Sequence, residues 1–121
     1  MGDSAGLRLL EDVKSLIAQG WSRGADARDA DLRPVDPWDA TAASWSILGA
    51  LVAILERRAQ TTGELPLEEV AAALYAIAHV VHVDSLEQWN DSFAHSQADV
   101  LGALDRAIAT YDAPYPHARA S

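Results

Sequence analysis

The sequence predicts an all-α protein, a compact four-helix bundle-like single domain with a central buried helix and one long ordered loop. Half of the 121 residues are hydrophobic, and alanine and leucine, which favour helices, dominate them. Apolar residues recur at helical spacing in four segments, and no segment alternates with period two for long enough to build a sheet. We expect the domain at residues 1–112 and a flexible tail at residues 113–121.

The net charge of the chain limits the classes of molecule that it can bind. Eighteen acidic and nine basic residues give a formal net charge of −9. Such a surface repels phosphates, so we expect no direct nucleic acid binding.

The chain has no cysteine, which excludes disulfides and cysteine-ligated zinc. Its apolar stretches are far shorter than the roughly 20 residues of a membrane span, and its start lacks a signal-peptide pattern. We therefore expect a cytoplasmic protein with no membrane contact.

The first helix is expected from about Ser4 to Gln19. Its apolar stripe recurs at helical spacing and consists of Leu7, Leu10, Val13 and Ile17. Gly20 is expected to end the helix in the left-handed conformation. Residues 21–38 then form a connection that is broken by glycine and proline, and connections of this length are commonly functional or compactly packed. Its alternating aspartates do not form an EF-hand, because the glycine and glutamate of that motif are missing.

The second helix is expected from about Asp39 to Ala59. Apolar residues occupy all its faces from Ala42 to Leu55, which predicts the buried centre of the bundle. The polar exceptions are Ser44 and Ser46, which we expect to bond to carbonyls one turn earlier. Trp45 is expected in the core. Gly49 lowers helix stability by about 1 kcal/mol relative to alanine, so we expect it to permit close packing with a neighbour.

The third helix is expected from Leu67 to Val83, and it carries two distinct faces. One face is the apolar core stripe. Another face holds polar side chains within about 60° of one another on a helical projection, and these are Glu68, Tyr75, His79 and His82. Because the helix is otherwise apolar, this face predicts contact with protein or with a ligand.

A second connection joins this helix to a fourth one, expected from Ser96 to about Tyr111 with Ser96 and Asp99 as its capping pair. Trp89, Asn90 and Asp91 lie in the connection, where Asn and Asp favour a turn and the tryptophan suits a lid over the core. If this connection folds over the histidine face, Asp91 and His95 join His79 and His82. That cluster would hold the chemistry of an active or metal site.

The histidine pair itself has several interpretations. A spacing of three residues on a helix can chelate a divalent metal, but a third ligand must come from elsewhere. The pair is not part of an HExxH motif. Structural or interface histidines are the commoner case, so we predict no cofactor and keep a divalent metal at His79 and His82 as an open alternative. No nucleophile elbow, phosphate-binding loop or Ser–His–Asp order is present.

Two stretches of the sequence resemble a family of small uncharacterised helical proteins from actinobacteria and their phages. They are GWSRGADARDADLRPVDPWDATAASWSILGAL and WNDSFAHSQADVLGALDRA. The resemblance covers roughly residues 7–111, nearly the whole domain. It implies a self-standing helical domain in which the loop from Trp21 to Trp38 and the turn from Trp89 to Asp91 belong to one pattern. It implies no activity and no catalytic residues.

Three functions follow from these patterns. The first is a non-enzymatic cytoplasmic accessory or regulatory protein that binds a protein partner or a small ligand through the Tyr75/His79/His82 face, with the neighbouring Glu68 and the loop residues Trp89, Asn90, Asp91 and His95. A homodimer would also cover this face. The second is a small metal-assisted or acid–base enzyme that uses His79, His82, Asp91 and His95. The third, suggested by charge alone, is an acidic phage-type inhibitor that mimics nucleic acid.

Overall fold

The computed structural model describes residues 5–63, 67–81, 89–93 and 96–112, and it confirms a mostly helical fold. Its helices are α1 (Ala5–Gln19), α2 (Ile47–Thr62), α3 (Leu67–Val81), the π-helical turn η1 (Trp89–Phe93) and α5 (Gln97–Asp112). Two short strands, β1 (Ala27–Arg28) and β2 (Ser44–Trp45), pair antiparallel in the long loop. The tail predicted at residues 113–121 lies outside the described residues.

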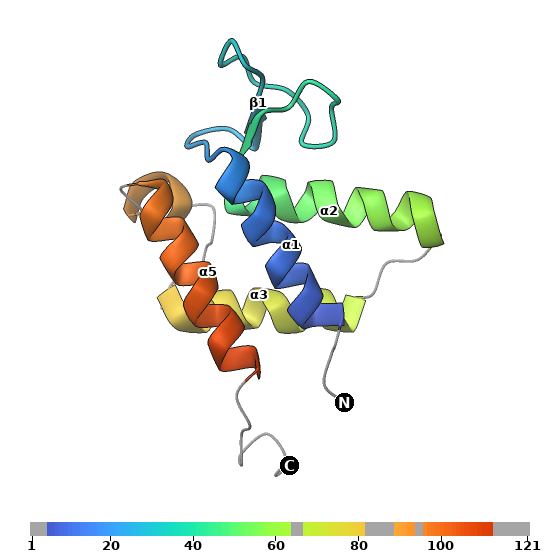
Figure 1. Cartoon of the computed structure of the whole chain (residues 1–121), viewed down its shortest axis with the longest axis vertical. Coiled ribbons are helices and arrows are strands. Elements are labelled where there is room, and N and C mark those ends of the chain that lie inside the picture. Colours follow the sequence, from blue (N-terminus) through green and yellow to red (C-terminus); the bar gives the residue numbers. More distant parts are fainter. Residues whose placement is uncertain (1–4, 64–66, 82–88, 94–95, 113–121) are drawn as a thin grey trace.

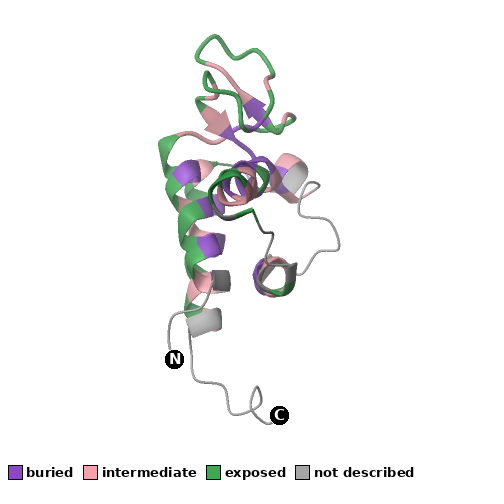
Figure 2. Cartoon of the chain, turned by 90° about the vertical axis from the view of Figure 1, so that its right-hand side faces the viewer, coloured by how far each residue is buried: buried purple, intermediate pink, exposed green. Residues whose placement is uncertain are grey.

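The four long helices form two layers (Figures 1 and 2). In one layer α1 and α5 lie side by side, and in the other α2 and α3 run across them. Helix α1 packs against α2, α3 and α5, whereas the main contacts of α2 are with α1 and β2. The prediction that the second helix is the centre of the bundle is therefore wrong. The central helix is α1, which contributes five buried apolar side chains, Leu9, Leu10, Val13, Leu16 and Ile17.

Helix α2 begins at Ile47, eight residues after the predicted start. Ser46 is its N-cap, and the Ser46 hydroxyl accepts a hydrogen bond from the Gly49 amide at 3.0 Å. The expectation that Ser46 bonds back to an earlier carbonyl was therefore wrong, since the same hydroxyl satisfies an unpaired amide of the first turn. Trp45 is buried as predicted, but in β2, and its indole donates to the Pro37 carbonyl at 3.0 Å.

The other ends lie closer to the prediction. Helix α2 ends at Thr62. Its C-cap is Gly63, which has a left-handed φ of 77° and whose amide donates a hydrogen bond to the Ala59 carbonyl. Ser96 caps α5 through a 3.2 Å bond from the Asp99 amide, as the capping pair predicts. The described part of α3 ends at Val81, and His82 and Val83 lie outside the described residues.

The long loop, residues 20–46, is ordered by its own hydrogen bonds and projects from the helical body (Figure 1). Trp45 donates its amide to the Gly20 carbonyl and accepts the Ser22 amide, each at 3.0 Å. At the tip, one Asp29 carboxylate oxygen accepts the amides of Asp31 and Arg33 at 2.9 Å. Asp29 therefore builds the turn at the tip, and the prediction of one long ordered loop is confirmed.

Two glycines allow this loop to lie against the helices. A Cβ on Gly49 would lie 1.8 Å from the Asp26 carbonyl oxygen, so the predicted close packing is confirmed, with the loop as the neighbour. A Cβ on Gly20 would lie 2.3 Å from the Ala43 carbonyl oxygen. Gly20 does not have a positive φ, so its predicted left-handed conformation is wrong. Both positions need glycine because a backbone passes where a side chain would begin.

We expect Gly49→Ala to lower the free energy of unfolding by about 2 kcal/mol or more, because overpacking against a backbone carbonyl outweighs the gain in helix propensity. Chemical denaturation followed by circular dichroism measures this change. Gly102→Ala in α5 is the matched control, because the nearest atom to its Cβ would be the end of the Arg106 side chain at 3.7 Å. The control should raise the stability by about 0.5–1 kcal/mol. Equal effects of the two substitutions would contradict the close approach.

Candidate functional site

The outer face of α3 carries part of the predicted site. Tyr75 is 72% exposed, and its ring stacks on that of His79, with centroids 6.0 Å apart and planes at 21°. Glu68 and His79 are also exposed. Residues 68, 75 and 79 share this face because they are spaced by seven and four positions along the helix. The stack places a phenol and an imidazole together at the surface.

Asn90 is fully buried, and its side-chain amide joins three segments of the chain. The Asn90 Oδ1 atom accepts the Trp21 indole N–H at 2.8 Å and the Ile47 amide at 3.2 Å. The Asn90 Nδ2 group donates to the Ser22 carbonyl at 3.1 Å and to Asp91 Oδ1 at 2.9 Å. We call these contacts the Asn90 network. It connects η1 to the start of the long loop and to the first turn of α2.

The residues beside Asn90 extend this connection. Asp91 Oδ1 also accepts the Gly24 amide at 2.9 Å. Trp89 is half-buried and packs against the core, consistent with the predicted lid. On the outer side, the Arg23 guanidinium lies 5.4 Å from the centroid of the Trp21 ring, within the range of a cation–π contact. This contact covers the indole whose N–H Asn90 holds.

The structure gives only part of the predicted histidine cluster. His82 and His95 lie outside the described residues, and the side chains of Asn90 and Asp91 are hydrogen-bonded to the long loop and to α2. In the described part of the chain, no group of three or more His, Asp or Glu side chains is arranged to hold a metal ion.

Sequence reasoning missed the partnership of Trp21 with Asn90, which lie 69 positions apart. The periodicity of the chain carries no sign of it. The family resemblance carried one, because it placed the Gly-Trp start of the loop and the Trp-Asn-Asp turn in one pattern. In the structure these two stretches are in direct contact.

Asp39, in the loop before β2, has its pKa held below its ordinary value of 3.8. The Thr41 hydroxyl, at 2.6 Å, is the largest cause, and the Thr41 amide, at 2.8 Å, is the second. Both groups donate to the carboxylate and stabilise its charged form. The resulting stability is present above the pKa of the unfolded state and is lost as the pH falls through the pKa of the folded state.

Asn90→Ala should lower the free energy of unfolding by about 3 kcal/mol, because it leaves the Trp21 N–H, the Ile47 N–H and the Ser22 carbonyl without their partner. Trp21→Phe removes one donor and keeps the ring, so we expect a loss of about 1 kcal/mol. Urea denaturation of both variants measures the difference. A loss for Asn90→Ala no larger than that for Trp21→Phe would show that Asn90 does not join the three segments.

Thr41→Val should raise the pKa of Asp39 towards its ordinary value, because the hydroxyl is lost and the amide donor remains. A pH titration of the Asp39 carboxyl carbon by NMR measures this change. Thr61→Val is the control, since the Thr61 hydroxyl donates to the Arg57 carbonyl. An unchanged Asp39 titration in Thr41→Val would rule out the hydroxyl as the cause.

No described helix is long and apolar enough to cross a membrane.

Comparison with known proteins assigns the chain to a family. No curated protein and no solved structure was found to match the chain. Residues 1–110, which hold both α3 and the Asn90 network, match a family of unknown function, DUF6197. The chain therefore belongs to the DUF6197 family.

Proposed function

We propose that this chain is a non-enzymatic accessory or regulatory protein of the cytoplasm that binds a protein partner through the outer face of α3. We call this surface the Tyr75 face, and it consists of Glu68, Ala71, Tyr75 and His79, all of them exposed. The exposure of Tyr75 carries the proposal. At 72%, Tyr75 is the most exposed of the large hydrophobic side chains in the described residues.

The chemistry of the Tyr75 face supports a protein partner. Tyrosine is enriched at the centres of protein interfaces because its ring buries a large area and its hydroxyl can form a hydrogen bond. The stack with His79 restricts the ring before binding, which lowers the entropy lost when a partner covers it. In a chain with a net charge of −9, this face holds one carboxylate, so burying it costs little electrostatic free energy.

The proposed partner is a protein, which is either a different protein or a second copy of this chain. Because α3 is one of the outer elements of the two-layer fold, a partner can reach the Tyr75 face without opening the core (Figure 1). Membership of DUF6197 names no partner. The partner therefore has to be found through the face itself.

A photoreactive phenylalanine analogue in place of Tyr75 should form a covalent product with the partner in cells, or with a second copy in the purified protein. The same analogue in place of the exposed Arg106, on α5, is the control and should not give that product. Mass spectrometry of the product identifies the partner.

Competition with protein that lacks the photoreactive residue shows whether the covalent product comes from specific binding or from random collision. Excess wild-type protein should suppress the product, whereas Tyr75→Asp protein should be about tenfold less effective because it places a charge at the centre of the interface. The proposal fails if both positions give the same product, if position 75 gives none, or if both competitors suppress it equally.

A further inference from the structure

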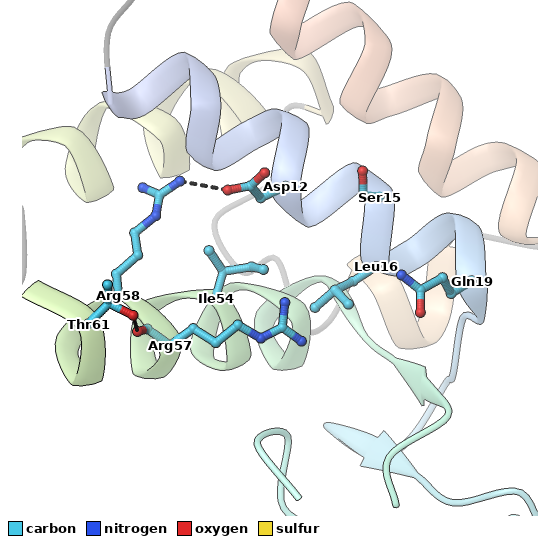
Figure 3. A pocket seen from close by; sticks show the side chains of 8 residues that line it. All are labelled: Asp12, Ser15, Leu16, Gln19, Ile54, Arg57, Arg58 and Thr61. Atoms are coloured by element: carbon cyan, nitrogen blue, oxygen red, sulfur yellow. Dashed lines mark hydrogen bonds and ion pairs between the residues drawn. The ribbon is translucent and has the colours of Figure 1, made fainter. Parts of the chain in front are cut away.

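A second surface, on the side of α2 that faces α1 and the long loop, forms an open groove, and Figure 3 shows one of its two hollows. It consists of two hollows of about 300 and 400 Å³. Both are lined by Leu16 and Gln19 of α1 and by Arg57 of α2, so they meet at these side chains. We call them together the Arg57 groove. Its size is within the range of small-molecule sites.

The acidic side chains that line the groove have partners of their own. Asp12 is ion-paired with Arg58 at 2.7 Å, and Glu56 accepts a hydrogen bond from Gln60 at 3.0 Å. Asp39 accepts both donors of Thr41, as described above. None of these three carboxylates is hydrogen-bonded or ion-paired with Arg57.

Arg57 differs from these neighbours. Its side chain extends along α2 towards Leu16 and Gln19, whereas Arg58 turns to Asp12 (Figure 3). Within the described ranges, the Arg57 guanidinium makes no hydrogen bond or ion pair, and the Arg57 carbonyl accepts a hydrogen bond from the Thr61 hydroxyl. Arg57 is an exposed residue, and an arginine guanidinium can bind a carboxylate through two parallel hydrogen bonds.

The rest of the lining indicates an apolar group beside the charge. Trp38 lines the larger hollow and is 54% exposed, and Trp45 and Ala53 are buried residues of the same wall. An indole that is half in water offers a flat apolar surface on which a ring can stack. The amides of Gln19 and Gln60 lie in the same lining and supply further hydrogen-bonding groups.

We propose that the Arg57 groove binds a small acid that carries one carboxylate and a flat apolar ring, with the carboxylate on Arg57 and the ring against Trp38. A multiply charged anion such as phosphate is disfavoured. Arg57 can neutralise one negative charge of the ligand. The other charged groups of the lining are three carboxylates and Arg58, so a second negative charge on the ligand would be repelled.

Titration of the ¹⁵N-labelled full chain with 2-naphthoate tests the proposal by NMR. We expect saturable shifts of the Trp38 indole and of the Gln19 and Gln60 side-chain amides, with a dissociation constant of about 1 mM or tighter. The probe 2-naphthamide has the same ring and no charge, so it should bind about tenfold more weakly. Inorganic phosphate should not displace 2-naphthoate.

Arg57→Gln should weaken 2-naphthoate binding about tenfold or more and leave the naphthamide affinity unchanged. Arg106→Gln is the matched control because Arg106 is an exposed arginine of α5 outside the groove. Circular dichroism checks that each variant is folded. Arg57→Lys is a second variant, which keeps the positive charge but cannot form two parallel hydrogen bonds to a carboxylate. Equal binding of the acid and the amide, no saturable shift, or an unchanged affinity in Arg57→Gln would each overturn the proposal. Tyr75→Asp should bind 2-naphthoate normally, so the groove and the Tyr75 face can fail independently.

Discussion

The fold depends on one buried side-chain amide, that of Asn90. Its oxygen and nitrogen hold a tryptophan N–H, the first amide of α2 and a loop carbonyl. A buried amide is stable in a core only when its hydrogen-bonding groups are satisfied, and each of these bonds joins η1 to a distant segment. The same amide therefore fixes where the long loop begins and where α2 starts. The backbone can approach this closely because Gly20 and Gly49 have no Cβ.

The existence of the four long helices could be predicted from the sequence, because apolar residues recur at helical spacing in each of them. The start of α2 could not. Residues 39–46 contain alanines, serines and a tryptophan in an order that fits a helix as well as a loop, and Ser46 fits an interior position as well as a cap. The pairing of Ser44–Trp45 with Ala27–Arg28 decides in favour of the loop, and no local sequence pattern reveals this contact. The choice of central helix failed for a related reason, since apolar content does not determine how many neighbours a helix has.

For the functional surfaces, too, the sequence allowed only part to be predicted. Helical spacing placed Tyr75 and His79 on one face, and the stack of their rings follows from a separation of four positions. The Arg57 groove could not be predicted, because Leu16, Trp38 and Arg57 come from two helices and a loop that only the folded chain brings together. The protein thus has two surfaces of different chemistry. One is an aromatic face of low charge, and the other is a hollow with an arginine at the junction of its two parts.

The Asn90 network also has a consequence for the order of events during synthesis. Trp21 and Asn90 are separated by 69 positions, so at about 5–20 residues per second the ribosome adds Asn90 about 3–14 s after Trp21. Until Asn90 has been added, the indole N–H of Trp21 lacks the acceptor that it has in the folded chain, and so does the Ile47 amide from the time when it is made. The N-terminal half of the nascent chain can form helices and the hydrogen bonds within the long loop, but not the bonds that join this loop to η1. The part of the chain that is made early is therefore among the last to reach its final conformation.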